Sequence, residues 1–442
     1  MAYTVSLTSL GCSKNQIDAE IMLAKLALAG FEYTADEDEA DIIIVNTCAF
    51  IEDAKTESID VILDIARLKQ EGSLKLLVVT GCMAERYREQ ILKEMPEVDA
   101  VVGIGANADI VDIITNALSD KKRVCRYDDK LLLPLSGPRF IATPHYMAYI
   151  KIAEGCDNRC TYCAIPGIRG KYRSRSLSDI VGEAAMLAQR GVKELILIAQ
   201  DTTRWGEDIG NERLPDLLER LCRIEGIKWI RILYAYPEKI DDRLISVIRD
   251  NPKIVKYIDI PLQHSEDGIL RRMNRRTTKS DIISLISRLR AEIPGIVLRT
   301  TILTGFPGES EEDFENLLEF IKSMRFERLG CFAYSQEEGT PAAGFDGQID
   351  EETKKRRQEL VMQLQQEISE EINEALKGQE TQVLVEGYDV YIKMWFGRSA
   401  AEAPDVDGKI FFTCAGGIEP GEFITVKITD TADGDLVGEA VR

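Results

Sequence analysis

With 442 residues, 45% of them hydrophobic and 29% charged, the chain is longer than one hydrophobic core usually supports, so two or three domains are expected. No apolar run is long enough to cross a bilayer and the first residues have no basic stretch before an apolar one, so we expect a cytoplasmic protein and no membrane partner. The net charge of −20 disfavours a partner bound through its phosphate backbone and favours a basic one, although acidity that only aids solubility gives the same total.

The first 120 residues alternate short apolar runs with helical patterns. Strands are predicted at 5–10, 42–45, 76–80 and 98–102, and helices at 17–30, 51–70, 85–95 and 108–118. This rhythm is typical of an open parallel α/β sheet with helices on its faces. We therefore predict a first domain over 1–120 and, from the Lys, Asp, Gly and Pro residues that follow, a linker over 121–141.

The central segment repeats this alternation with longer units. Six strands are predicted, at 147–152, 194–199, 229–234, 257–260, 296–303 and 328–332, with helices between them at 177–189, 214–221, 282–291 and 311–324. About six such units indicate a complete or partial (βα) TIM barrel, whose working face is formed by the C-terminal ends of the strands. The predicted core domain spans 142–372, and a helix over 350–377 leads out of it.

The remaining tail has a different character. Five short β-type runs, at 383–386, 390–396, 409–413, 423–428 and 436–440, are separated by Gly and Asp turns. They predict a small antiparallel β-barrel, OB-like, over 376–442. Residues 378–442 hold twelve Asp or Glu against five Lys or Arg, a balance of −7. Such a surface repels phosphate and attracts a basic protein, so nucleic-acid binding is not favoured.

Three cysteines with C-x3-C-x2-C spacing follow the first predicted strand of the barrel. They are Cys156, Cys160 and Cys163. Three thiolates satisfy three irons of a 4Fe–4S cubane and leave the fourth iron open, whereas four cysteines would close the cluster. An open iron can chelate S-adenosylmethionine (SAM). The alternative is a structural zinc site, but the chain has only two histidines and the nearer one, His145, is eleven residues away.

This spacing, with the aromatic Tyr162 between the last two cysteines, resembles the radical SAM superfamily. The resemblance implies that Tyr162 lies against the adenine of SAM. The turn with Gly305 and Gly308 resembles the glycine-rich turn beside the cofactor in that family, where backbone can approach a ligand closely. Three further candidates for its polar groups end a predicted strand, with ordinary strand-end capping as the alternative: Gln200, Asp201 and Thr202.

A second set of cysteines is spread through the first domain. Cys12, Cys48 and Cys82 each come just after a predicted strand, 36 and 34 residues apart. Because parallel strands end at one edge of a sheet, the three thiols can converge there. Three independent buried cysteines are the alternative. Convergence predicts a second cubane with an open iron, in which all three act as metal ligands.

Both cysteine sets together resemble the methylthiotransferase family. That family joins an N-terminal three-cysteine domain, a radical SAM core and a C-terminal TRAM barrel. The stretch SLGCSKN at 9–15, NTCAFI at 46–51 and IPLQH at 260–264 resemble its ribosomal-protein branch, the RimO type. The resemblance covers nearly the whole chain. The transfer-RNA branch, the MiaB type, typically has other residues around its first cysteine.

The resemblance implies a reaction that uses two 4Fe–4S clusters and two SAM molecules. One SAM methylates sulfur at the N-terminal cluster, and the other is reduced to a 5′-deoxyadenosyl radical. This radical takes a hydrogen atom from the β-carbon of an aspartate in ribosomal protein uS12, which then receives the methylthio group. The substrate is free or within the small ribosomal subunit, and an external electron donor and sulfur source are implied. The cofactors carry the chemistry, so no catalytic acid or base is predicted.

Other features of the sequence leave alternatives open. Arg169, Lys171, Arg173 and Arg175 follow the barrel cysteines and either bind a carboxylate of cofactor or substrate or form a solvated loop. Two other functions remain. One is methylthiolation of an adenosine in transfer RNA. The other is a nonenzymatic iron–sulfur or RNA-binding carrier, which the open-iron spacing at a barrel mouth disfavours.

Overall fold

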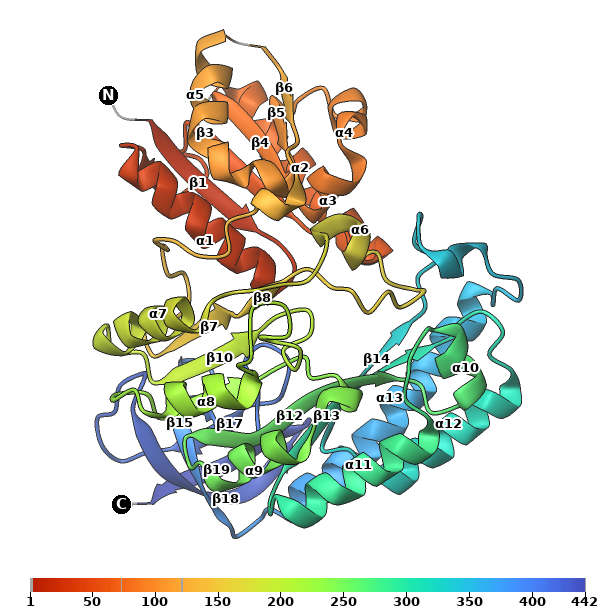
Figure 1. Ribbon diagram of the computed structural model, residues 1–442. Coiled ribbons are helices and arrows are strands. Elements are labelled where there is room, and N and C mark those ends of the chain that lie inside the picture. The colour runs from red at the N-terminus through yellow and green to blue at the C-terminus, as the bar shows by residue number, and fades with distance from the viewer. Residues whose placement is uncertain (1–2, 73, 121, 442) are drawn as a thin grey trace.

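The computed structural model describes residues 3–72, 74–120 and 122–441, which form three units in chain order (Figure 1). The predicted domain limits at 1, 121 and 442 lie outside the described residues. Among the helices of the described ranges, none combines the length and the apolar character that a membrane span requires.

The first unit is a six-stranded sheet in the order β2-β1-β3-β4-β5-β6, with every strand pair parallel. Its strands are β1 (Thr4–Ser9), β2 (Glu32–Tyr33), β3 (Ile42–Thr47), β4 (Leu76–Gly81), β5 (Ala100–Val102) and β6 (Val124–Arg126). Its helices are α1 (Ser13–Leu28), α2 (Glu52–Glu71), α3 (Cys82–Tyr87), α4 (Glu89–Glu94), η1 (Ile104–Asp109) and α5 (Ile110–Asp120).

Helices cover both faces of this sheet. In β3, Ile43 and Val45 pack against the side of α2, α3 and α4, whereas Ile42 and Ile44 pack against α1 and α5. Successive side chains of a strand point to opposite faces, so a strand between two helical layers needs an unbroken apolar run. This explains the IIIV sequence of β3.

Two features differ from the sequence prediction. The helix expected at 85–95 is divided into α3 and α4 at Arg88, whose φ of 48° is left-handed. The stretch predicted as a linker over 121–141 contributes β6, because the half-buried Val124 and Cys125 extend the core beside β5. The sheet therefore continues beyond residue 120.

The second unit is an open barrel of six parallel strands in the order β14-β13-β12-β11-β10-β7. These strands are β7 (Met147–Lys151), β10 (Glu194–Ile198), β11 (Trp229–Ile232), β12 (Ile254–Gln263), β13 (Val297–Thr304) and β14 (Arg328–Ala333). Helices around it are α7 (Leu177–Gln189), α8 (Leu214–Cys222), α9 (Asp242–Asp250), α10 (Asp267–Arg272), α11 (Lys279–Glu292), α12 (Glu311–Met324) and α13 (Glu351–Glu374). Shorter pieces are α6 (Ile165–Arg169), the pair β8 (Ala153–Glu154) and β9 (Arg173–Ser174), and the 3-10 turns η2 (Lys130–Leu132), η3 (Pro237–Lys239) and η4 (Pro341–Gly344).

Capping residues explain why two barrel helices have the predicted bounds. The Ser310 hydroxyl accepts a hydrogen bond from the Asp313 amide, and the Asp313 carboxylate accepts one from the Ser310 amide at 2.9 Å, which is a complete capping box for α12. At α7 the Ser176 hydroxyl accepts a hydrogen bond from the Asp179 amide. Satisfying the first free amides fixes where each helix begins.

The third unit is a closed five-stranded barrel in the order β15-β16-β17-β19-β18. Its strands are β15 (Glu380–Asp389), β16 (Met394–Arg398), β17 (Ile410–Thr413), β18 (Phe423–Ala432) and β19 (Asp435–Val441). One pair, β17 with β19, is parallel, and the others are antiparallel. The predicted fold class is confirmed: a parallel α/β sheet, a partial TIM-type barrel and a small C-terminal β-barrel.

The inward face of the open barrel is covered by the two other units. Ile17 and Ile21 of α1 and Leu384 of β15 share one apolar cluster with Tyr149 and Ile198 of the core strands. A buried ion triad fixes the C-terminal barrel further, because Glu194 of β10 pairs with Arg231 of β11 and with Arg398 of β16, both at 2.8 Å. All three side chains are buried, so these contacts are shielded from water.

Candidate functional site

The barrel cysteines lie in the loop between β8 and α6, at the C-terminal edge of the core sheet. Cys156 and Cys160 are buried and Cys163 is half-buried. The amide of Cys163 donates to the carbonyl of Cys160, and the amide of Cys156 to Gly170 at the end of α6, both at 3.1 Å. Burial raises the pKa of the Cys156 thiol to about 11, and neighbouring Cys160 adds to it. The loop thus gathers three thiols in a site with little water.

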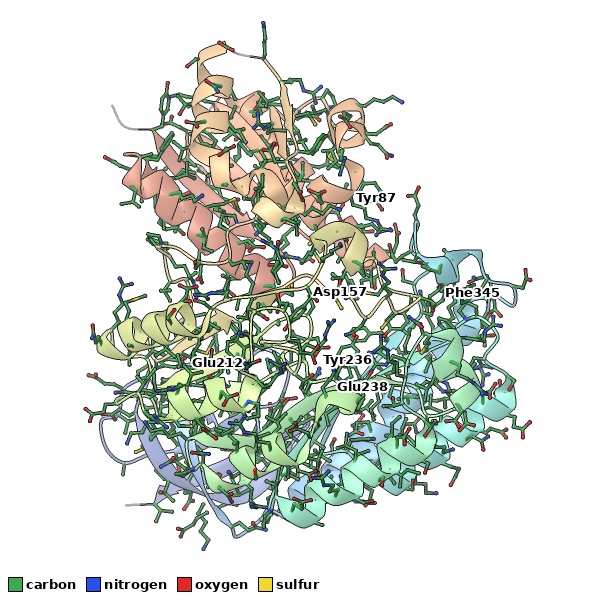
Figure 2. All side chains as sticks on the ribbon, viewed as in Figure 1. Tyr87, Asp157, Glu212, Tyr236, Glu238 and Phe345 are labelled. Carbon is green, nitrogen blue, oxygen red and sulfur yellow. The ribbon has the colours of Figure 1, made fainter. Side chains whose placement is uncertain are left out.

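Aromatic and cationic side chains surround Cys160. Its sulfur lies 3.6 Å from the hydroxyl of Tyr236 and 4.0 Å from the guanidinium of Arg275, which stacks on the Tyr236 ring. Tyr162 packs against the apolar cluster that contains Phe306 of the glycine-rich turn. The predicted adenine-side tyrosine and the predicted glycine turn are therefore neighbours. In Figure 2, Tyr236 is labelled between the first unit and the core.

The three predicted polar contacts after β10 differ from one another. Asp201 is buried and accepts hydrogen bonds from Asn158 of the cysteine loop at 2.9 Å and from Thr203 at 2.6 Å. Burial raises the pKa of its carboxyl. It lines a polar hollow of about 150 Å³. Thr202 instead donates to the carbonyl of Leu233, as strand-end capping does, and Gln200 is half-buried outside that hollow.

The glycine-rich turn has left-handed backbone at Gly305 and Gly308, with φ of 71° and 85°. A Cβ on Gly305 would come within 2.4 Å of the Cγ of Lys354 on α13, so this position needs glycine for packing. The amides of Gly305 and Phe306 donate to the carboxylate of Glu309. The turn is thus held by protein contacts, and the predicted cofactor role of its glycines stays a prediction.

The three cysteines of the first unit meet at the edge of its sheet. Cys12 precedes α1, Cys48 follows β3 and Cys82 begins α3. The chain leaves β1 and β3 on opposite faces, so their ends form the crevice where open α/β sheets bind ligands. A Cβ on Gly11 would lie 2.9 Å from the Cys48 sulfur, which shows how closely these loops approach.

Positive charge surrounds this second set of thiols. Burial would raise the pKa of the Cys12 thiol, but Lys14, Arg169 and the first amides of α1 lower it below its usual value. Burial raises the pKa of Cys82 to about 12, which Arg169 counteracts. A guanidinium nitrogen of Arg169 lies 3.7 Å from the Cys82 sulfur. Cations and helix amides suit thiolates and an anionic cluster.

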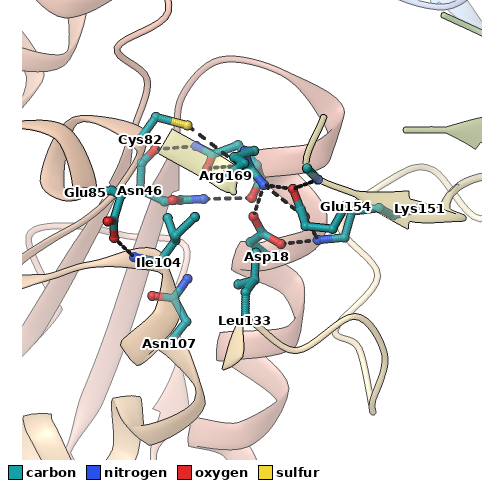
Figure 3. A network of polar contacts seen from close by, with 12 residues as sticks. Asp18, Asn46, Cys82, Glu85, Ile104, Asn107, Leu133, Lys151, Glu154 and Arg169 are labelled. Carbon is teal, nitrogen blue, oxygen red and sulfur yellow. Dashed lines mark hydrogen bonds and ion pairs between the residues drawn. The ribbon is translucent and has the colours of Figure 1, made fainter. Parts of the chain in front are cut away.

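A single buried network joins the two cysteine sites (Figure 3). Arg169, at the end of α6, donates to Asp18 of α1 at 2.9 Å and to Glu154 of β8 at 3.0 Å. Lys151 of β7 pairs with the same two carboxylates. All four side chains are at most 1% exposed. The network therefore ties the first unit to the loop that carries Cys156.

The barrel cysteines open on a cleft of about 580 Å³ that residues of the first unit also line. Cys160 and Cys163 form part of its wall, and α3, which begins at Cys82, contributes Glu85 and Arg86. In the described ranges, no three His, Cys, Asp or Glu side chains are spaced for one metal ion.

Comparison with known proteins identifies the family. Residues 4–103 match the uncharacterized protein family UPF0004, residues 150–321 the radical SAM superfamily and residues 378–441 the TRAM domain. The ribosomal protein uS12 methylthiotransferase RimO of Clostridioides difficile is 49% identical over 99% of this chain and 98% of its own. That of Lachnoclostridium phytofermentans is 50% identical over 98% of each. The chain belongs to the RimO family of radical SAM methylthiotransferases.

Solved structures agree on the fold. The radical SAM methyltransferase TsrM from Kitasatospora setae, with cobalamin and a [4Fe-4S] cluster, has a TM-score of 0.56 at 17% identity and covers 77% of each chain. The radical enzyme OxsB, with cobalamin and SAM, has a TM-score of 0.52 at 15% identity, over 82% of this chain and 56% of its own. The superfamily uses an iron–sulfur cluster and SAM. Two buried thiols and one half-buried thiol at the barrel mouth are the donor set that such a cluster needs.

For this member of the RimO family, sequence reasoning did not find the role of Arg169. It considered the basic run from Arg169 to Arg175 as a carboxylate-binding or solvated loop. The structure shows instead that Arg169 is buried in the domain junction and that Arg175 pairs with Asp179 and Glu183. Lys151 and Glu154 were missed as well. The sequence hinted at them only in that Lys151 ends an otherwise apolar strand and Glu154 lies two residues before Cys156.

Proposed function

We propose that this chain transfers a methylthio group to the β-carbon of an aspartate in ribosomal protein uS12 and holds two 4Fe–4S clusters. Cys156, Cys160 and Cys163 would hold one cluster, and Cys12, Cys48 and Cys82 the other. The observation that carries the proposal is that Arg169 joins the two cysteine sets, because it lies 3.7 Å from the Cys82 sulfur and donates to Glu154, two residues before Cys156. The names of the relatives support uS12 as the substrate.

The chain's own residues position and shield this chemistry. When bound, the clusters and SAM would supply the radical and the methylthio group. The backbone of the cysteine loop is held by Gly170 and Asn274, and Arg169 keeps the first unit against the core. Burial of the thiols excludes water, which protects reactive species from side reactions. Asp201 braces the loop through Asn158.

Charge on the C-terminal barrel supports a protein substrate. Residues 378–442 carry a balance of −7, and this barrel packs on the core beside α1. A basic ribosomal protein would be attracted to such a surface and RNA would be repelled. Transfer RNA, the substrate of the other branch of the family, is therefore the competitor to test.

The test offers both substrates to the same enzyme. The protein is reconstituted with iron and sulfide, reduced by dithionite and given SAM with either uS12 or transfer RNA, and each product is weighed. We expect uS12 to gain a methylthio group and transfer RNA to gain none. The opposite result would overturn the substrate assignment. Iron content should fall in Cys82→Ser and stay unchanged in the control Cys222→Ser, whose cysteine lies at the end of α8.

A further inference from the structure

We propose that Arg159 recognises the carboxylate of the substrate aspartate in the cleft beside Cys160 and Cys163. The inference rests on the proposed function and deepens it by naming the residue that selects the substrate. Arg159 lies in the cysteine loop, directly before Cys160, and lines the cleft. It belongs to none of the networks that hold the two sites together.

The other cations of the cleft already have partners. Arg86 pairs with Glu337 at 2.6 Å. Arg88 pairs with Glu85 at 3.1 Å, and Lys130 approaches Glu85 at 3.6 Å and donates to the carbonyl of Gly167. These contacts fix the walls of the cleft. They leave little positive charge free to receive a new anion.

Arg159 differs from the other cations of the cleft in two respects, the lack of a partner for its side chain and the conformation of its backbone. Its side chain is exposed, and no ion pair or hydrogen bond of its guanidinium occurs among residues 3–72, 74–120 and 122–441. Its φ of 52° is left-handed, where a non-glycine residue costs about 1–3 kcal/mol. The side chain of Asn274 holds this conformation by donating to the Arg159 carbonyl at 2.9 Å. The cysteine loop is thus held at Arg159 while its guanidinium stays unpaired among the described residues.

A carboxylate is the natural ligand of such a group. The planar guanidinium can donate two parallel hydrogen bonds to one carboxylate. In an aspartate the reacting β-carbon is bonded directly to the carboxyl carbon, so a group that holds the carboxylate also places the carbon that reacts. Asparagine has the same shape without the charge. Recognition by Arg159 would therefore separate aspartate from asparagine.

Glu338 adds a negative charge to the same cleft. It lines the same cleft and is exposed, and among the described residues its carboxylate has no ion pair. It would repel the substrate carboxylate and attract a basic residue beside it. An aspartate in a basic protein would meet both Arg159 and Glu338 among the residues that line the cleft.

The experiment measures binding and transfer with matched substrates. Holoenzyme is titrated with fluorescently labelled uS12 and with uS12 in which the target aspartate is replaced by asparagine, in the absence of reductant. We expect the wild type to prefer the aspartate form by about 10- to 100-fold, and Arg159→Gln to lose most of this preference by binding the aspartate form more weakly. Arg159→Lys should keep part of it. Under turnover, Arg159→Gln should raise the KM for uS12 far more than it lowers kcat.

Arg88→Gln is the matched control, because it removes one positive charge from the same cleft but from a paired side chain. It should keep the preference for aspartate. The proposal would be overturned if Arg88→Gln lost as much of the preference for aspartate as Arg159→Gln, or if Arg159→Gln kept the full preference. A raised KM for SAM in Arg159→Gln would overturn it too. Iron loss in both Arg159 variants would assign the residue to loop folding and overturn it as well. If wild-type enzyme transfers nothing to uS12, the proposed function fails instead.

Discussion

Replacing Arg169 with Gln should loosen the junction between the first unit and the core. The guanidinium pairs with Asp18 and Glu154, and Lys151 is the second cation that faces both carboxylates. In Arg169→Gln, two buried carboxylates share a single ammonium group. Removing one partner from a buried ion pair costs about 3–5 kcal/mol, because the remaining charge is left without compensation. We expect a loss of that size in the free energy of unfolding at pH 7.

The loss should depend on pH in a defined direction. Burial would raise the pKa of Glu154, but Arg169 and then Lys151 lower it from 4.5 to about 2. In the wild type, this carboxylate therefore stabilises the fold above pH 4.5, and the contribution is lost as pH falls toward 2. Without Arg169, one of the two cations that lower the pKa of Glu154 is gone, so this pKa should rise. Protonation then relieves the uncompensated charge at a higher pH, so the difference in the free energy of unfolding between variant and wild type should narrow as pH falls from 7.

A double-mutant cycle in urea measures this coupling. Unfolding of wild type, Arg169→Gln, Glu154→Gln and the double variant is followed by circular dichroism, and cleavage of the 122–141 segment by a protease reports opening of the junction. The double variant should be less destabilised than the sum of the single variants, because it removes the uncompensated charge. The reasoning would be refuted if the two single variants lost free energy of unfolding additively. It would also be refuted if the difference in that free energy between Arg169→Gln and wild type widened as pH falls.

Four other substitutions test different parts of the structure. Cys156→Ser should abolish SAM cleavage, measured as 5′-deoxyadenosine, whereas Cys82→Ser should keep cleavage and lose methylthio transfer; loss of cleavage in both would contradict separate roles. Glu194→Gln removes the carboxylate that pairs with both Arg231 and Arg398 and should release the C-terminal barrel to proteolysis, at a cost of about 3–5 kcal/mol. Gly305→Ala should lower the melting temperature, because its Cβ would meet Lys354 at 2.4 Å in a left-handed backbone; an unchanged value would argue against that contact.

Much of the fold could be predicted because buried parallel strands and capped helices leave local signals. The strands β3 and β4 each begin with four consecutive apolar residues, and Ser310, which caps α12, is followed three residues later by Asp313. The short strands β2 and β6 carry no such signal. They are two and three residues long and become strands only by pairing at the edges of an existing sheet. Propensity alone does not reveal them.

The candidate site could be predicted only in part, for a different reason. Cysteine spacing and the position of each cysteine after a strand are local, so both sets could be found in the sequence. The junction depends on Asp18, Lys151, Glu154 and Arg169, which come from three segments. Charged residues in a sequence are usually solvated, and only their burial together reveals an ion network. The sequence for this reason left the basic run at Arg169 open between a carboxylate-binding site and a solvated loop.

The same network limits how a substrate can enter. Asp18 follows Cys12 on α1, Glu154 precedes Cys156 by two residues, and Arg169 ends the helix that follows Cys163. Any large movement of the first unit away from the core would separate these charges, at the cost derived above for Arg169. The spacing of the two cysteine sites is therefore expected to stay fixed during the reaction. A cleft of about 580 Å³ accepts a side chain with a short piece of backbone and excludes a folded domain. For the proposed uS12 substrate, we therefore expect the aspartate to lie on a protruding loop that enters the cleft without opening the junction.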